Sequence, residues 1–311
     1  GSTLSGLDQR SSVYGCYVNM TIYTQIDENK NKSLLIMAVF VVLISLLAFV
    51  FDKVEGFGSG LLLPALVFSV LSSLGGYYYS DKIILAISGA KLVEEKSNPE
   101  LYRLVENICI AAGLPKPKIY TIDDSAPNAF ATGRDPSHAS ICFTTGILSK
   151  LNRLELEGVV AHELSHIKNY DIRFMSIVTV MVGMVALLSD WYLRSFWYRS
   201  RRKEERNSGN IGAVMLIIAI VLAVLSPIFA TLVQLAISRK RELLADASSA
   251  LLTRYPDGLA SALEKIAADK ETLEAANRAT APLYIVNPFK GEQIKGFLTN
   301  LFNTHPPIEE R

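Results

Sequence analysis

The stretch that decides the fold is LELEGVVAHELSHIKNYDIRFMSIVTVMVG, Leu154–Gly183, in which His162, Glu163 and His166 form the pattern HELSH. Residues four apart on a helix project from the same face. The two imidazoles can therefore hold one Zn²⁺ at about 2.0–2.1 Å. Glu163 lies beside that face, where its carboxylate can take a proton from metal-bound water. A long hydrophobic tract follows, so the sequence predicts a water-handling metal site built against a membrane.

The metal-site interpretation competes with a simpler one, a helix that exposes two histidines beside an acidic residue. The whole chain contains four histidines, and two of them at this spacing around a glutamate favour the metal site. Asn152 and Glu155 are spaced as a capping pair and predict where the HELSH helix begins.

The composition is that of a membrane protein. Half of the 311 residues are hydrophobic, while 31 Lys and Arg nearly balance 30 Asp and Glu. A net charge of +1 and the lack of a polybasic tail give no sign of a nucleic-acid partner. We therefore expect the lipid bilayer, and not nucleic acid, to be a partner.

The hydrophobic residues are concentrated in four blocks. A helix rises about 1.5 Å per residue, so about 20 apolar residues cross a hydrocarbon core of roughly 30 Å. Pro64 is predicted to break the second block, and the third is rather short. The sequence thus predicts about four membrane helices. The blocks are Ser33–Phe51, Gly56–Ser80, Phe174–Ser189 and Gly209–Ser238.

The regions between the blocks are patterned as a soluble domain. SNPELYRLVENICIAAG, residues 97–113, predicts an amphipathic helix with Asn98 as its N-cap and Gly113 past its end. KIYTI (118–122), NAFATG (128–133) and ASICFTTG (139–146) predict three short strands. Two more helices are predicted at 239–255 and 258–277.

The predicted fold is an α+β membrane protein, mostly helical, with a zincin-like catalytic domain that contains a small β-sheet and the HELSH helix. The catalytic domain is predicted to be split by the second pair of membrane helices. The expected parts are residues 1–19 as a tag or unstructured extension, 20–80 as a membrane hairpin, 81–173 as the first catalytic segment, 174–238 as a second membrane hairpin, and 239–311 as the second catalytic segment.

A catalytic zinc needs a third protein ligand and an open position for water. Glu242, in SRKRELLAD, is the best candidate, because it follows the fourth block as HELSH precedes the third. Asp246 lies one helical turn further on, where it can accept the free N–H of a ligand histidine. The alternative is that Glu242 merely neutralises the basic residues before it on a solvated helix, and the spacing alone leaves both possibilities open.

The combination of HELSH, SRKRELLAD, NAFATG and THPPIEER, interleaved with four hydrophobic blocks, resembles the HtpX-type membrane metalloproteases. These belong to the broader peptidase family that includes the CaaX prenyl proteases. The resemblance runs from about Met20 to Arg311, where family members usually continue for some residues. It implies that His162, His166 and Glu242 bind one zinc per chain, that Glu163 is the catalytic base, and that Asp246 belongs to an ExxxD element.

The same resemblance implies that the NAFATG strand pairs with an extended substrate. The residues concerned are Asn128, Ala129, Phe130, Ala131 and Thr132. An extended backbone can add to a sheet edge in this way and bind broadly. From the sequence alone, a structural strand followed by a glycine turn is an equal alternative.

A second catalytic group is predicted at His305. It is the histidine that remains after the two ligands and His138, which lies in a polar turn, are set aside. Pro306 and Pro307 would present its imidazole from a stiff turn, and the resemblance places this segment near the zinc. His305 is therefore a candidate donor to a tetrahedral oxyanion, and a C-terminal surface histidine is the alternative.

The predicted function is that of an integral membrane zinc endopeptidase in the cytoplasmic (inner) membrane. Its catalytic domain is expected to face the cytosol, with unfolded or damaged membrane proteins as substrates in proteolytic quality control, a role that rests on the resemblance alone. The alternatives are a CaaX-type prenyl protease, disfavoured by the small number of hydrophobic blocks, and a non-catalytic scaffold or chaperone with a structural zinc, disfavoured by Glu163.

The orientation in the membrane follows from the flanking charges. Lys30 and Lys32 before the first block predict a cytosolic N-terminus. The basic loop between the third and fourth blocks, residues 194–206, favours the cytosol as well. These two blocks are expected to cross the membrane, and the alternative is that they enter it without crossing.

Overall fold

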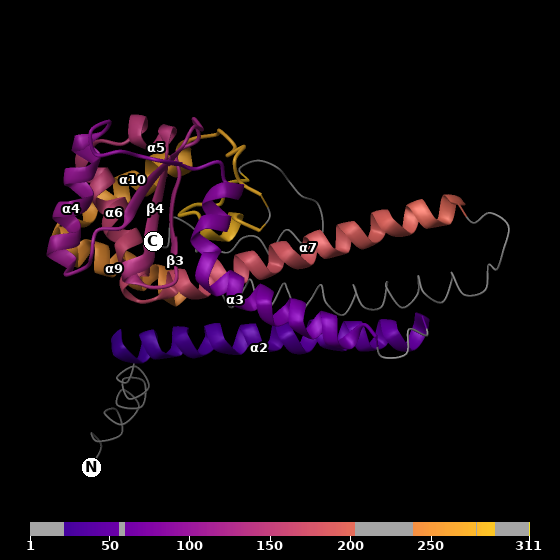
Figure 1. Cartoon of the computed structure of the whole chain (residues 1–311). Helices are drawn as coiled ribbons and strands as arrows, with labels where there is room; N and C mark the ends of the chain where they lie inside the picture. The colour runs from indigo at the N-terminus through magenta and orange to yellow at the C-terminus, as the bar shows by residue number, and fades with distance from the viewer. Residues whose placement is uncertain (1–21, 56–59, 203–238, 278, 290–310) are drawn as a thin grey trace, which may run out of the picture.

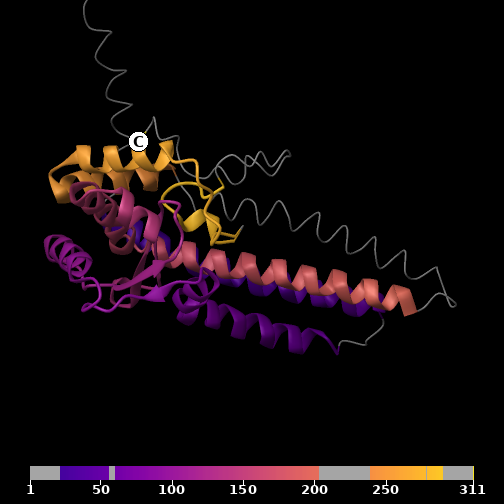
Figure 2. The same cartoon turned by 90° about the horizontal axis from the view of Figure 1, so that it is seen from above.

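The computed structural model describes residues 22–55, 60–202, 239–277, 279–289 and 311. A globular region holds the sheet and the shorter helices, and three long helices project from it side by side (Figures 1 and 2). The long helices are α2 (Ile22–Glu55), α3 (Leu62–Ile87) and α7 (Asp171–Arg202), and each of them packs against the other two.

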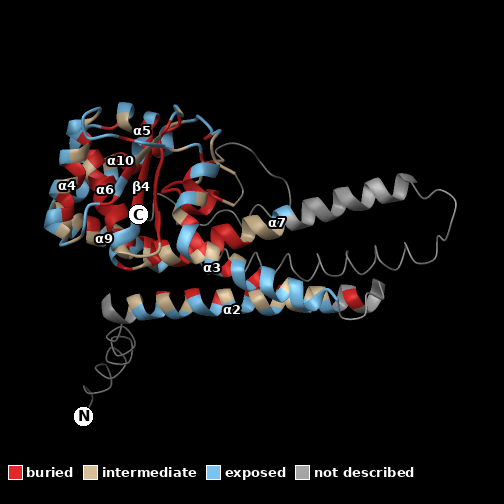
Figure 3. Cartoon of the chain, in the orientation of Figure 1, coloured by how far each residue is buried: buried red, intermediate tan, exposed pale blue. Residues whose placement is uncertain are grey.

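Two of the long helices are candidate membrane spans by length and composition. The segment Gln25–Phe49 of α2 has a mean hydropathy of 2.6, and α3 has a mean hydropathy of 1.3. Their outward surfaces are largely exposed (Figure 3) and carry large aliphatic side chains, among them Leu35, Val42 and Leu71. Such a surface is stable in lipid, where exposed apolar side chains carry no hydration penalty.

The predictions for the second, third and fourth hydrophobic blocks have different outcomes. Pro64 does not break the second block; it lies in the first turn of α3, where a missing N–H costs little. The third block belongs to a longer helix, α7, whose residues as far as Leu187 are a candidate span together with α6 (Arg153–Lys168), across a bend of 82°. The fourth block, residues 209–238, lies outside the described residues, so four membrane helices stay a prediction.

A four-stranded sheet lies in the globular region, in the order β1-β2-β4-β3. Strands β2 and β4 are parallel, whereas β3 pairs with β4 in antiparallel fashion, so β3 is an edge strand. The three predicted strands are confirmed, but β1 is too short to leave a periodic pattern. The strands are β1 (Lys91–Leu92), β2 (Lys118–Ile122), β3 (Ala129–Gly133) and β4 (Ala139–Thr144).

Helix α4 (Pro99–Ala112) has the predicted bounds. The Asn98 side chain accepts from Leu101 N at 3.1 Å, and Gly113 takes the left-handed conformation with φ 68°. The third predicted strand is too long, because the chain turns into α5 (Thr145–Lys150) directly after β4. The Thr144 hydroxyl accepts from Ile147 N and so caps that helix.

The two predicted helices near the end of the chain are α9 (Arg239–Thr253) and α10 (Pro256–Ala268). The second was predicted to reach Asn277, and this is wrong. After Ala268 the backbone bonds to side chains instead: Glu271 N donates to Asp269, and Ala275 N donates to Asp124.

Helix α6 (Arg153–Lys168), which carries HELSH, occupies the centre of the globular region. It begins with a capping box in which Asn152 and Glu155 each bond to the other's backbone N–H. Helices α9 and α10 pack on it. The contact with α10 is close because Gly158 has no side chain; a Cβ there would lie 2.7 Å from Leu259 N. The chain then bends sharply at Tyr170, where φ is +60°, and continues as α7.

Candidate metal centre

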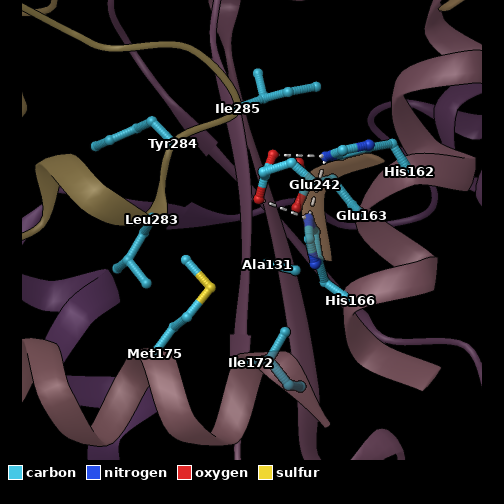
Figure 4. A pocket seen from close by; sticks show the side chains of 10 residues that line it. All are labelled: Ala131, His162, Glu163, His166, Ile172, Met175, Glu242, Leu283, Tyr284 and Ile285. Carbon is cyan, nitrogen blue, oxygen red and sulfur yellow. Dashed lines mark hydrogen bonds and ion pairs between the residues drawn. The ribbon is translucent and has the colours of Figure 1, made fainter. Parts of the chain in front are cut away.

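Three buried side chains from two helices converge on one point. His162 and His166 project from one face of α6, and Glu242 faces them from the first turn of α9 (Figure 4). The two Nε2 atoms are 3.1 Å apart. The Glu242 carboxylate oxygens lie 3.7 Å from His162 Nε2 and 3.6 Å from His166 Nε2. Ligands at about 2.0–2.1 Å from a tetrahedral ion are roughly 3.4 Å apart, so these three fit around one metal ion.

The charges around this point also fit a divalent cation. Among the described residues, the guanidinium groups of Arg241 and Arg311 lie beside four carboxylates. A metal ion is often the largest local charge in such a site and favours carboxylates around it. The carboxylates are those of Glu163, Asp171, Glu242 and Asp246, each buried or nearly so.

The ring of His162 has a carboxylate beside it. His162 Nδ1 lies 2.9 Å from Asp246 Oδ1. Burial lowers the pKa of His162 to about 4, although the Asp246 hydrogen bond acts in the other direction. The imidazole is therefore neutral at pH 7 and its Nε2 lone pair is available to a metal. A carboxylate in this position fixes the tautomer and the ring orientation.

The ring of His166 has a different carboxylate beside it, one that the sequence analysis did not single out. His166 Nδ1 lies 3.1 Å from Asp171 Oδ2, at the start of α7. Burial would lower the pKa of His166, but the Asp171 hydrogen bond and the charges of Glu242 and Asp171 outweigh it and raise the pKa to about 9.

Glu163 lies in the same pocket and is fully buried. Its carboxylate lines the pocket beside the ligand atoms (Figure 4) and accepts a hydrogen bond from Ala131 N. Burial raises the pKa of Glu163 to about 7.

Comparison with known proteins agrees with this geometry. Residues 95–311 match peptidase family M48. The chain belongs to this family. It is 47% identical over 291 residues to a protein named Protease HtpX homolog from Dictyoglomus thermophilum, with 94% of this chain and 93% of that protein covered. A Protease HtpX homolog from Caldanaerobacter subterraneus subsp. tengcongensis is 42% identical over 293 residues, with 94% and 96% covered.

The resemblance to HtpX-type proteases is therefore confirmed. The crystal structure of S. mikatae Ste24p is also similar to this M48 chain, at 21% identity and a TM-score of 0.48. That similarity covers 93% of this chain and 65% of the Ste24p chain.

Arg311 is a member of the site that the sequence analysis did not single out. Its guanidinium donates to both Asp246 oxygens, at 2.7 and 2.9 Å, and to Ile285 O at 3.1 Å. The same group lies 3.5 Å from His162 Nε2 and 3.7 Å from Glu242 Oε2. The Arg311 guanidinium thus contacts both members of the Asp246–His162 pair. Arg311 is part of the THPPIEER motif, but the sequence does not show that it contacts Asp246 and Ile285, because both are far from it in the chain.

The predicted substrate strand lies beside the metal centre, but its outer edge is occupied. Ile285 N donates to Ala129 O at 3.0 Å, and the Asn128 amide donates to Val286 O at 2.9 Å. Thr132 is buried, with its hydroxyl 2.8 Å from that of Ser176. A substrate that pairs with this edge must therefore displace residues 285–286.

Leu283, Tyr284 and Ile285, which adjoin or belong to this covering segment, line one side of the pocket. The free volume beside the ligands is about 10 Å³, which holds about one water molecule. Leu283–Ile285 were not singled out from the sequence, because they lie in an irregular stretch without periodicity. The pocket is lined by Ala131, His162, Glu163, His166, Ile172, Met175, Glu242, Leu283, Tyr284 and Ile285.

His305 lies outside the described residues, so its predicted role as an oxyanion donor stays a prediction. His138 is on the surface, where its Nδ1 lies 2.7 Å from Asp135 Oδ1.

Proposed function

We propose that this M48 peptidase is an integral membrane zinc endopeptidase. The observation that carries the proposal is the buried convergence of His162, His166 and Glu242 with Glu163 alongside. Two imidazoles and one carboxylate are a ligand set of catalytic zinc sites, which keep a position for water. When bound, zinc supplies a water of pKa near 7 and polarises the scissile carbonyl.

Glu163 performs the proton transfers. Its carboxylate takes the proton from the attacking water and delivers it to the leaving amine, a contribution of about 10²–10⁴-fold. His305 donates to the oxyanion. Support for that role is indirect: Arg311, six residues further along the chain, contacts the metal-ligand cluster.

We infer that the substrate binds as an extended strand along β3, at Asn128–Thr132, after the segment that now covers this edge has moved. Main-chain pairing recognises any unfolded segment with little regard to sequence. Such broad recognition suits the clearance of unfolded or damaged membrane proteins. The relatives named Protease HtpX homolog belong to the same family.

The site is proposed to lie at the cytosolic surface of the cytoplasmic membrane. Support comes from the candidate spans α2 and α3 and from the start of α7 at Asp171, five residues beyond His166. A single cysteine at Ser200, in a chain without its native cysteines, tests the predicted crossing of α7. Labelling of intact cells by an impermeant thiol reagent supports it, and labelling only after lysis contradicts it.

The test of the function combines metal analysis with casein hydrolysis, with and without a chelator. The wild type is expected to hold one zinc and to cleave casein, and the chelator abolishes cleavage. Glu163→Gln should keep the zinc and lose the activity, because the base is not a ligand. A zinc-loaded Glu163→Gln protein that cleaves at the wild-type rate contradicts the proposal.

The two alternatives give different results in the same assays. A structural zinc in a scaffold predicts metal without hydrolysis of casein. A CaaX-type prenyl protease predicts cleavage of a prenylated peptide in strong preference to its unprenylated form.

A further inference from the structure

Helix α2, a candidate membrane span, places one buried polar side chain against the carboxylate that lies beside His166. Asn29 of α2 is 3% exposed. Its amide donates to Asp171 Oδ1 at 2.7 Å and to Asn169 O at 2.9 Å. Asp171 is the carboxylate whose other oxygen lies 3.1 Å from Nδ1 of His166. A chain of two hydrogen bonds therefore links the membrane helix to a metal ligand.

Asn29 lies where the elements that carry the metal ligands meet. Asn169 caps the end of α6, and Asp171 begins α7. Arg241, the residue before the ligand Glu242, lies 3.5 Å from Asn29 Oδ1 and 3.6 Å from Asp171 Oδ1. One amide side chain thus bonds to the C-terminal end of α6 and the start of α7, and lies beside the start of α9.

The geometry favours a role in positioning over a role in packing alone. A carboxylate that accepts one bond on each oxygen cannot rotate without breaking one of them, so Asn29 fixes the plane of Asp171. Asp171 in turn fixes the imidazole of His166, as outer partners of metal ligands do. Burying an asparagine side chain within a candidate span also costs free energy, and polar residues retained at such positions are usually functional.

We propose that Asn29 is a positioning residue of the metal centre, through which the first membrane helix becomes a part of that centre. The inference rests on the proposed zinc site. It implies that α2 does more than anchor the protein, since the orientation of a metal ligand depends on the place of this helix.

The test measures zinc affinity in the full-length protein in detergent, by competition with a chromophoric chelator. Asn29→Leu keeps a side chain of similar size and shape but replaces the polar amide with an apolar group, which removes the hydrogen bonds. Loss of an outer partner of a metal ligand typically costs about 10–100-fold in affinity. Asn29 is one bond further out, so we expect about a tenfold loss. Asn29→Ala makes no steric demand and should lose as much.

Ile36→Ala is the matched control. Ile36 is buried two turns along the same helix and packs beside Val178 and Met181 of α7. Its truncation should lower the thermal midpoint without changing the zinc affinity. The visible spectrum of the Co²⁺-loaded protein should change in Asn29→Leu and stay unchanged in Ile36→Ala, because only the former disturbs the ligand geometry.

A double-mutant cycle with Asp171→Asn locates the effect. If Asn29 acts through Asp171, the two losses of affinity are not additive. Wild-type affinity in both Asn29 variants overturns the inference, as do additive losses in the cycle or an equal loss in Ile36→Ala. In each of these cases the wild type still binds zinc. A wild type that binds no zinc overturns the proposed function, and this inference with it.

Discussion

Arg311 donates two hydrogen bonds to Asp246, at 2.7 and 2.9 Å, while Asp246 Oδ1 lies 2.9 Å from the ligand His162. Burial acts to raise the pKa of Asp246, but the hydrogen bonds of Arg311 and His162 outweigh it and lower the pKa to about 2. The carboxylate is therefore ionised throughout the physiological range. Arg311 thus fixes the carboxylate that lies beside the His162 ring, although 65 residues separate Arg311 from Asp246.

The first prediction concerns Arg311→Met. The variant keeps much of the side-chain volume but removes both hydrogen bonds to Asp246, so His162 loses its fixed orientation. Zinc affinity, measured by chelator competition, should fall about tenfold, because Arg311, like Asn29, lies one bond beyond the carboxylate that contacts the histidine. Arg153→Met, on an exposed side chain of α6, serves as the control and should bind zinc as the wild type does.

The second prediction concerns the third ligand. Glu242→Ala leaves two histidines, fewer than the three protein ligands of a catalytic zinc. Zinc should be lost on dialysis, as metal analysis would show. Asp257→Ala removes an exposed carboxylate from the corresponding first turn of α10 and should retain the metal. Stoichiometric zinc in dialysed Glu242→Ala would assign the third ligand to another residue.

The third prediction is the pH dependence of hydrolysis. Burial raises the pKa of Glu163 to about 7 in the metal-free protein, and the charge of a bound metal must lower it. Because only the ionised form accepts a proton, kcat/KM should fall as the pH drops through this pKa, with an acid limb at or below about pH 7. Arg311 also lowers the pKa of Glu163. In Arg311→Met at saturating zinc the acid limb should therefore move to higher pH, and an unmoved limb would show that another group titrates.

The sequence predicted the parts of the site that depend on local structure. The HELSH helix was correct because its capping box and the spacing of its histidines lie within a single helix. Glu242 is far from the histidines in the chain, and only the resemblance favoured it over a solvated glutamate. Asp171 and Asn29 escaped prediction because their partners are brought together by the bend at Tyr170 and by the packing of α2 against α7.

The covering segment was missed for a related reason. Residues 284–286 follow a short 3-10 helix, Ala281–Leu283, and are held by the backbone of β3 and by the side chain of Asn128. These contacts require no periodic pattern or motif in the covering residues, so the sequence of this segment does not predict them. Helix α10 was predicted too long because its apolar pattern continues, whereas bonds to Asp269 and Asp124 stop the helix.

The fourth prediction separates two roles for Asn128. Its side chain bonds to both backbone groups of Val286, at 2.9 and 3.4 Å, and so holds the segment that covers β3. If substrate must displace this segment, Asn128→Ala increases the fraction of protein that can bind, and KM for an unfolded protein should fall several-fold. A direct contact between Asn128 and substrate predicts the opposite, a raised KM. Steady-state kinetics with casein decide between them.

The last prediction concerns the crossing of α6 and α10. An ideal Cβ at Gly158 would lie 2.7 Å from Leu259 N and 2.9 Å from Leu259 Cα, and neither backbone atom can move without the whole helix. Gly158→Ala should therefore separate the helices, at a cost of about 1–3 kcal/mol, typical of overpacking. The thermal midpoint of the detergent-solubilised protein should fall by several degrees.

Gly75→Ala provides the comparison for this substitution. Gly75 lies in α3 with nothing within 4 Å of its ideal Cβ, so alanine there meets no neighbouring atom and should leave the midpoint as high as in the wild type. A lowered midpoint is therefore expected for Gly158→Ala alone. A Gly158→Ala protein as stable as Gly75→Ala would mean that α6 and α10 do not pack at this distance. The support that α10 gives to the HELSH helix would then have to come from other contacts.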